Sequence, residues 1–204
     1  MSILIYAESA EGKIKKVALE LASYAKKVAA SMGTTVTAVT INNADNSALA
    51  ACGVDKVLTV TNDKLNNFSA KAYADVIVQA AKKEGTQIVL VSSSTNSLYL
   101  APLVAVALEA GYVSNVVALP ESTSPFQVKR TVFSNKAFNV TEIATPIKVL
   151  GIAKNSFGLV ESASTLAEES FAPSLNDADF GIKVESVKKV SGKVTIADAE
   201  IVVS

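Results

Sequence analysis

Two polar loops carry the side chains that could bind a ligand, and each follows a short apolar run. The first loop, residues 8–16, reads ESAEGKIKK and places Lys15 and Lys16 at the start of an amphipathic stretch. Lysines in a first helical turn oppose the helix dipole, so a bound anion would explain them. The simpler interpretation is that both are solvated and are balanced by Glu8 and Glu11.

The second loop, residues 92–97, reads SSSTNS and leads into another apolar helix pattern. Six hydroxyl and amide side chains at a helix start could hold a phosphate or a ribose. The same residue types are also the preferred helix caps, which is the simpler interpretation. Neither GxGxxG nor GxxxxGK[ST] occurs in the sequence, so a glycine-cradled phosphate has no support.

Acidic residues cluster near the C-terminal third, at Glu168, Glu169, Asp177 and Asp179. Paired carboxylates can act as general acid and base. Since these four lie in a stretch with little apolar patterning, we expect them on the solvated surface instead.

The composition excludes much catalytic chemistry. The chain has no histidine, so it has no Ser-His-Asp triad and no imidazole metal site, and we predict no catalytic and no metal-binding residues. Cys52 is the single cysteine, which we expect in the core instead of as a reactive thiol, and a reducing cytoplasm suits it. Arg130 is the only arginine and is either an anion anchor or an outward-facing strand residue. The net charge of zero argues against a nucleic-acid partner.

The N-terminus lacks a targeting pattern, and the longest apolar stretch, residues 98–110, is too short for the ~20 residues that cross a bilayer, so we expect no membrane insertion. The first 110 residues alternate strand and helix patterns, which predicts an α/β fold: a doubly wound, mainly parallel sheet with helices on both faces. The expected strands are 3–6, 35–41, 56–60 and 87–91, and the expected helices are 14–32, 47–52, 70–83 and 98–110.

After Pro120 the pattern changes to strands that follow one another too closely for crossover helices. We expect antiparallel strands at 127–133, 138–144 and 147–153, which complete an N-terminal domain over residues 1–154. The organisation expected beyond it is a loop or linker at 155–181, an additional strand of the same domain at 182–190, and at 191–204 a connector with the first strand of a second α/β domain that this chain lacks.

Several segments resemble the electron-transfer flavoprotein alpha (large) subunit, in family order. Residues 8–21 (ESAEGKIKKVALEL) resemble its first loop and helix, and residues 51–58 (ACGVDKVL) its turn into the third strand. Leu100-Ala101-Pro102 is similar to its Leu-Ala-Pro helix opening, residues 131–150 to its hairpin region, and residues 197–204 to the strand that leads into its flavin domain. The segment 96–99 departs from the family because it lacks a charged pair found there.

The resemblance implies an adenine-nucleotide-hydrolase-like α/β domain that acts as scaffold and docking surface and is not an enzyme. It implies FAD in the complete protein, with contacts beyond Ser204 and none held by this chain alone. The implied partners are the beta subunit, flavin dehydrogenases and a redox acceptor, and the isolated fragment could associate with itself through an unpaired strand. The alternative is a nucleotide-binding regulatory module resembling universal stress proteins, which would use the two polar loops.

Overall fold

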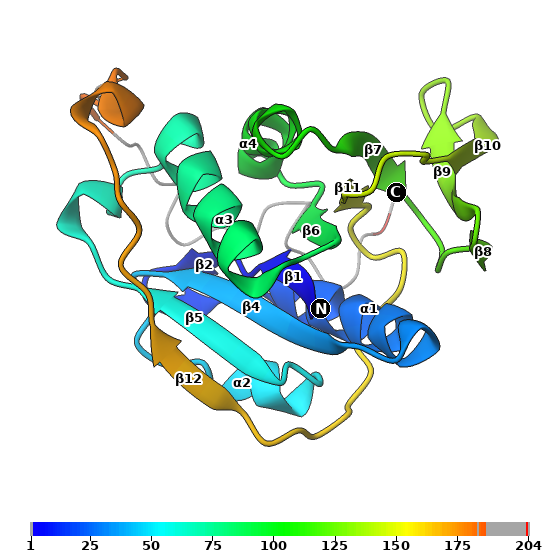
Figure 1. Ribbon diagram of the computed structural model, residues 1–204, viewed down its shortest axis with the longest axis horizontal. Helices are drawn as coiled ribbons and strands as arrows, with labels where there is room; N and C mark the ends of the chain where they lie inside the picture. Colours follow the sequence, from blue (N-terminus) through cyan, green and yellow to red (C-terminus); the bar gives the residue numbers. More distant parts are fainter. Residues whose placement is uncertain (1, 183, 187–202, 204) are drawn as a thin grey trace.

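The computed structural model describes residues 2–182, 184–186 and 203. Its described part is built around one large sheet with the strand order β10-β9-β7-β11-β6-β1-β4-β5-β12, in which β8 also pairs with β9 (Figure 1). The parallel strands are β1 (Ser2–Tyr6), β4 (Thr35–Ile41), β5 (Lys56–Val60), β6 (Ile88–Ser92), β11 (Lys148–Ile152) and β12 (Ala167–Ser170). β7 (Gly111–Val116) pairs parallel with β11 and antiparallel with β9, which joins the antiparallel strands to the sheet.

The antiparallel part consists of β8 (Ser122–Thr123), β9 (Phe126–Val132) and β10 (Ala137–Glu142). A separate two-stranded hairpin, β2 (Ser9–Ala10) and β3 (Lys13–Ile14), forms in the first polar loop. The predicted antiparallel strands at 127–133 and 138–144 are therefore confirmed within one or two residues.

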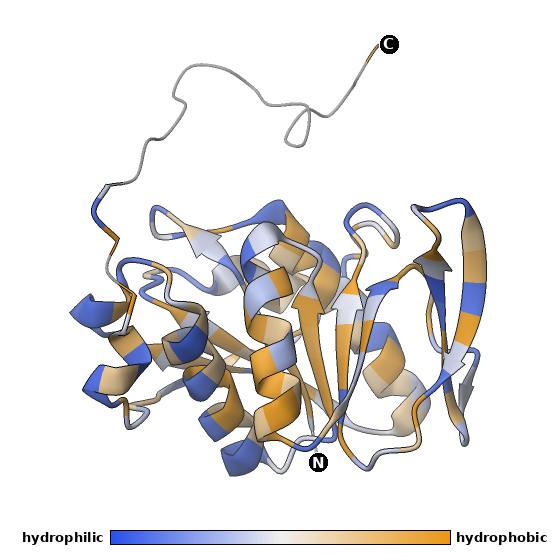
Figure 2. Cartoon of the chain, turned by 90° about the horizontal axis from the view of Figure 1, so that it is seen from above, coloured by the Kyte–Doolittle hydropathy of each residue, from blue (hydrophilic) through white to orange (hydrophobic). Residues whose placement is uncertain are grey.

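Helices cover both faces of the sheet. α1 (Lys16–Met32) buries residues such as Leu21, Ala25 and Val28 in one core, while α3 (Ala70–Glu84) and α4 (Thr95–Ala107) pack over the other face. The short helices are α2 (Ser47–Ala51), η1 (Asp63–Leu65) and η2 (Asp177–Phe180). The hydrophobic residues of the central strands lie between these helix layers (Figure 2), as a parallel sheet requires. The predicted doubly wound α/β fold is confirmed.

Local sequence signals account for several element ends. α1 and α3 both end at a glycine in the left-handed conformation, Gly33 (φ 63°) and Gly85 (φ 59°). α4 begins three residues before the predicted start, because the Ser94 hydroxyl accepts a hydrogen bond from the backbone N–H of Ser97 and caps the helix there.

The prediction that residues 147–153 form an antiparallel strand is wrong. β11 lies parallel between β7 and β6, and its residues Val149 and Leu150 are fully buried. The connection between the parallel neighbours β7 and β11 contains the hairpin β9–β10, where a crossover helix would be expected. β7 was not predicted, since its sequence GYVSNV mixes polar and apolar residues without a strict alternation.

The interpretation of residues 155–181 as a loop is wrong at two places. β12 adds to the free side of β5, and η2 packs against α3. The sequence AEES carries no apolar alternation, so this strand depends on backbone pairing and on ion pairs of Glu169 with Lys56 and Lys83. Of the strand predicted at 182–190, residues 182 and 184–186 have no regular structure and the others lie outside the described residues, as does 191–204 apart from Val203.

Candidate functional site

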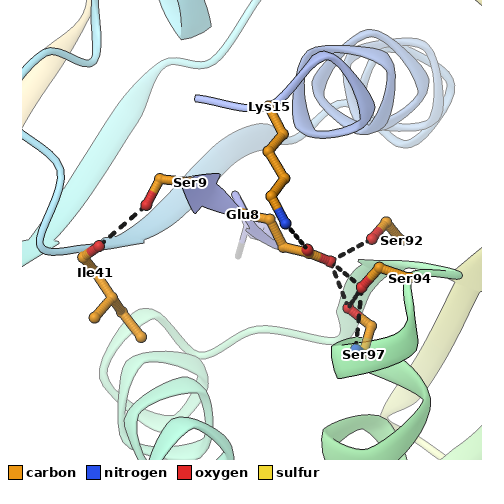
Figure 3. Close-up of polar contacts among 7 residues, drawn as sticks. All are labelled: Glu8, Ser9, Lys15, Ile41, Ser92, Ser94 and Ser97. Atoms are coloured by element: carbon orange, nitrogen blue, oxygen red, sulfur yellow. Dashed lines mark hydrogen bonds and ion pairs between the residues drawn. The ribbon is translucent and has the colours of Figure 1, made fainter. Parts of the chain in front are cut away.

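The two polar loops meet at the carboxylate of Glu8. Ser92 and Ser97 donate hydrogen bonds from their hydroxyls to Glu8 Oε1 at 2.6 and 2.9 Å, and the Ser94 hydroxyl donates to the same oxygen (Figure 3). On the other side, Lys15 Nζ lies 3.2 Å from Glu8 Oε2. The residue is only 2% exposed, so this is a buried carboxylate with four donors around it.

The sheet topology brings these residues together. Glu8 follows β1, and Ser92 ends β6, which is the parallel neighbour of β1. After β1 the chain forms β4 and then β5 on one side of β1. It then forms β6 on the other side of β1, and β11 and β7 lie beyond β6. The crevice between the carboxyl ends of β1 and β6 is therefore the topological switch point, which is the usual ligand site of such sheets.

The Glu8 carboxylate fills this crevice at the N-terminus of α4, where a phosphate would otherwise be favoured by the helix dipole and by free N–H groups. Burial alone would raise the pKa of Glu8, but the hydrogen bonds from Ser92 and Ser94, the charge of Lys15 and the bond from Ser97 outweigh it. The pKa consequently lies below its ordinary value of 4.5. Glu8 is thus an internal anion, and the described residues do not fit a dinucleotide pyrophosphate at this position.

A polar hollow of about 360 Å³ lies beside this crevice, toward β4. Its lining residues are Ser9, Ala10, Glu11, Gly12, Ile41, Asn42, Leu65, Asn66 and Tyr73. The first loop contributes its tip to the hollow, and the Ser9 hydroxyl donates to the carbonyl of Ile41 at 3.2 Å (Figure 3). Lys13, Lys15 and Lys16 do not line it, so its described lining offers no cation for a phosphate.

Arg130 is held within the fold. Its Nη2 donates to the Ser114 hydroxyl at 3.3 Å, which ties β9 to β7, and its Nε is buried with no hydrogen-bond partner among the described residues. A second hollow, of about 530 Å³, lies next to it and is lined by Lys129, Lys154 and Phe138, while Arg130 itself does not line it.

Cys52 lies at the end of α2 and is 6% exposed, as expected for a core residue. Burial is the main cause of its raised thiol pKa. A high pKa leaves little thiolate at neutral pH, so a nucleophilic role has no support.

The four acidic residues of the C-terminal third differ in their surroundings. Glu168 is exposed, and Asp177 forms an exposed ion pair with Lys64 at 2.9 Å, as a solvated position predicts. Glu169 lies between Lys56 (2.7 Å) and Lys83 (2.8 Å), whose hydrogen bonds lower its pKa to about 2. The prediction of a solvated position is wrong for Asp179, because this residue is only 3% exposed.

Asp179 is buried where η2 meets α3. It accepts hydrogen bonds from Lys71 Nζ at 2.5 Å and from the backbone N–H of Asn176 at 2.7 Å. These two bonds, the one from Lys71 being the larger effect, lower the pKa of Asp179. Its contacts fasten the C-terminal segment to α3. Asp179 also interacts with the carboxyl group of Asp75 on α3, whose pKa is raised by burial and then by the charge of Asp179.

Sequence reasoning missed Glu20, a second buried carboxylate. Its oxygens accept hydrogen bonds from the backbone N–H groups of Asn155, Phe157 and Gly158 at 2.9 to 3.0 Å. Glu20 therefore fastens the start of the segment after β11 to α1. The available signal was its position four residues before Tyr24 on the buried side of the helix.

The residues that the structure describes contain no cluster of three or more histidine, cysteine, aspartate or glutamate side chains that could hold a metal ion. None of the helices in the described ranges is long and apolar enough to span a membrane.

The fold and the site define a doubly wound α/β domain whose switch-point crevice is closed by its own glutamate. Residues 3–176 match the family model of the electron transfer flavoprotein domain, and the chain belongs to this family.

Its relatives include several electron transfer flavoprotein alpha subunits. The alpha subunit of Thermoanaerobacterium thermosaccharolyticum is 27% identical over 99% of this chain and 64% of its own length. That of Bacillus subtilis is 24% identical over 99% of this chain and 63% of its own length. The LctC subunit of the NAD- and ferredoxin-dependent lactate dehydrogenase of Acetobacterium woodii is 30% identical over 71% of this chain and 36% of its own. The chain corresponds to an N-terminal part of the alpha subunits that makes up slightly less than two thirds of their length.

Proposed function

We propose that this chain is the N-terminal scaffold and subunit-docking domain of an electron-transfer flavoprotein alpha subunit, in the cytoplasm. The complete protein would accept electrons from flavin dehydrogenases through FAD and pass them to a redox acceptor. In this proposal the FAD contacts lie beyond Ser204, and the domain docks onto the beta subunit. Membership of the family and the match to alpha subunits along nearly the whole chain support it.

The observation that carries the proposal is the closure of the switch-point crevice by Glu8. A buried carboxylate with three hydroxyl donors already satisfies the groups that would bind a cofactor phosphate. A second anion at this place would meet like-charge repulsion in a site of low dielectric. A domain closed in this way contributes a framework for the protein instead of a cofactor site.

Purification and binding experiments test the two parts of the proposal. The purified chain is expected to be colourless and to release no FAD on denaturation, and a stoichiometric flavin absorbance would overturn the scaffold role. Co-expression with the cognate beta subunit is expected to give a stable complex on size-exclusion chromatography. Failure to form that complex would refute the docking role.

The polar hollow of 360 Å³ beside β1 and β4 favours a second candidate, a nucleotide-binding regulatory module like the universal stress proteins. Its volume is within the usual range of small-molecule sites, although its described lining has no lysine or arginine. Calorimetric titration with ATP and AMP separates the candidates, since micromolar affinity would favour the regulatory module.

A further inference from the structure

The two edges of the main sheet are built differently. At one edge, β12 has four residues, two of them glutamates, and Glu169 is paired with two lysines. Short, charged edge strands resist pairing with other chains. At the other edge, β10 has six residues and a single charge, Glu142 at its end. Among the described residues β10 has β9 on one side and no strand on the other.

The open side of β10 presents both backbone groups and apolar side chains. Ile143, just after the strand, donates its N–H to the carbonyl of Phe126 at 2.9 Å. An antiparallel ladder alternates bonded and non-bonded pairs, so the N–H and C=O groups of Phe138, Val140 and Glu142 point away from β9. The side chains of Phe138 and Val140 are 65% and 47% exposed, and they share one face of the strand because they are two residues apart.

The sequence of this edge is complementary to itself. Residues 136–142 read KAFNVTE, with Asn139 at the centre. When two copies run antiparallel about this residue, Lys136, the turn residue just before β10, lies in one copy opposite Glu142 of the other. Phe138 then lies opposite Val140, which is a favourable aromatic and β-branched pair, and no like charges face each other.

We propose that β10 is a self-association edge, where a second copy of this chain adds its own β10 in antiparallel orientation about Asn139. The outward N–H and C=O groups of both strands are then paired, and the two sheets form one continuous sheet. The exposed aromatic and aliphatic side chains become partly buried on one face. This inference does not depend on the proposed electron-transfer role, because it concerns the 204-residue chain alone.

Val140→Pro tests the edge without removing a hydrogen bond between β10 and β9. The substitution removes an N–H that points away from β9, and proline is tolerated at such edge positions. Light scattering coupled to size-exclusion chromatography should find wild type at twice the chain mass of 21.2 kDa at high concentration. Val140→Pro should raise the dissociation constant at least about tenfold, since two hydrogen bonds per dimer are lost. Val140→Thr keeps the N–H and should remain dimeric.

The charges test the register independently of proline. Lys136→Glu places two acidic pairs across the interface, and Glu142→Lys places two basic pairs, so each should weaken the dimer about tenfold at low salt. The double variant Lys136→Glu/Glu142→Lys restores both pairs and should recover the wild-type constant. A monomeric wild type, an equally dimeric Val140→Pro variant with wild-type circular dichroism, or failure of the double variant to recover would overturn the proposal. A monomer that binds a strand of another protein at β10 would also overturn the second copy as occupant.

Discussion

Replacing Glu8 by glutamine removes one charge from the buried network and keeps nearly the same shape. Wild-type Glu8 accepts hydrogen bonds from Ser92, Ser94 and Ser97 on one oxygen and pairs with Lys15 on the other. In Glu8→Gln an amide oxygen can still accept from the serines, but these bonds are no longer charge-assisted. We therefore expect a folded but less stable protein.

The size of the loss follows from the type of bond. A hydrogen bond to a charged group contributes about 1.5–3 kcal/mol and a neutral one about 0.5–1.5 kcal/mol, so each of the three serine bonds weakens by about 1 kcal/mol. The Lys15 side chain is 41% exposed, so its pair adds about 0.5 kcal/mol at most. The free energy of unfolding should fall by about 3 kcal/mol at neutral pH, which corresponds to about 6–12 °C in Tm for a chain of this size.

The pH dependence provides the sharper test. The pKa of Glu8 in the folded protein is depressed below 4.5, so its stabilising contribution is present above the pKa of the unfolded chain. The contribution is lost as the pH falls through the folded pKa, since protonated Glu8 resembles glutamine. The difference in unfolding free energy between wild type and Glu8→Gln should stay constant from about pH 7 to pH 5.5 and shrink below about pH 4.5.

Urea unfolding followed by far-ultraviolet circular dichroism measures this difference at each pH. Taking the difference between the two proteins removes the contribution of the other acidic groups, such as Glu169 with its pKa of about 2. Glu121→Gln, a change at an exposed glutamate, serves as the matched control and should stay within about 0.5 kcal/mol of wild type. Equal stability of Glu8→Gln and wild type at pH 7, or a difference that persists unchanged at low pH, would refute the assignment of Glu8 as a buried anion.

Two further predictions concern the fold. Glu20→Ala leaves three backbone N–H groups without their acceptor, so trypsin should cleave after Lys154 many times faster than in wild type, while Glu20→Gln should show an intermediate rate. Gly111→Ala brings a new Cβ to 2.6 Å from Ile143 Cγ2 and should lower the free energy of unfolding by about 1–3 kcal/mol. Gly151→Ala, whose Cβ would meet its neighbours at 3.4 Å or more, should stay within about 1 kcal/mol; equal losses at both glycines would contradict the packing around Gly111.

Those elements that carry their own local signal could be predicted from the sequence. β4 and β5 coincide with the predicted strands, because β-branched runs are bounded by turn residues there. The strands that depend on their neighbours could not be predicted. A short apolar run such as β11 does not reveal whether it pairs parallel or antiparallel, and β12 forms through backbone pairing with β5 although its sequence is polar.

The residues of the candidate site could be predicted from the sequence, but the contact between the two loops that carry them could not. The sequence places Glu8 and the serines of residues 92–97 in two separate loops. It predicts that the charges of the first loop balance one another and that the second loop caps a helix. Capping is confirmed for Ser94, while Glu8 points inward to the other loop. A contact across 84 or more residues depends on β1 and β6 being neighbours in the sheet, and local periodicity contains no information about that pairing.

The two buried glutamates of the described structure perform related tasks at different places. Glu8 neutralises the donors at the start of α4, and Glu20 neutralises three N–H groups at the start of the segment that follows β11. Both positions lie at or just beyond carboxyl ends of parallel strands, where related sheets bind anionic ligands. At both places a carboxylate from the chain itself satisfies donors that a ligand anion could otherwise bind. The docking framework proposed above would need such internal anions to be stable without a cofactor, and the same contacts are why removal of the Glu8 charge should weaken the fold.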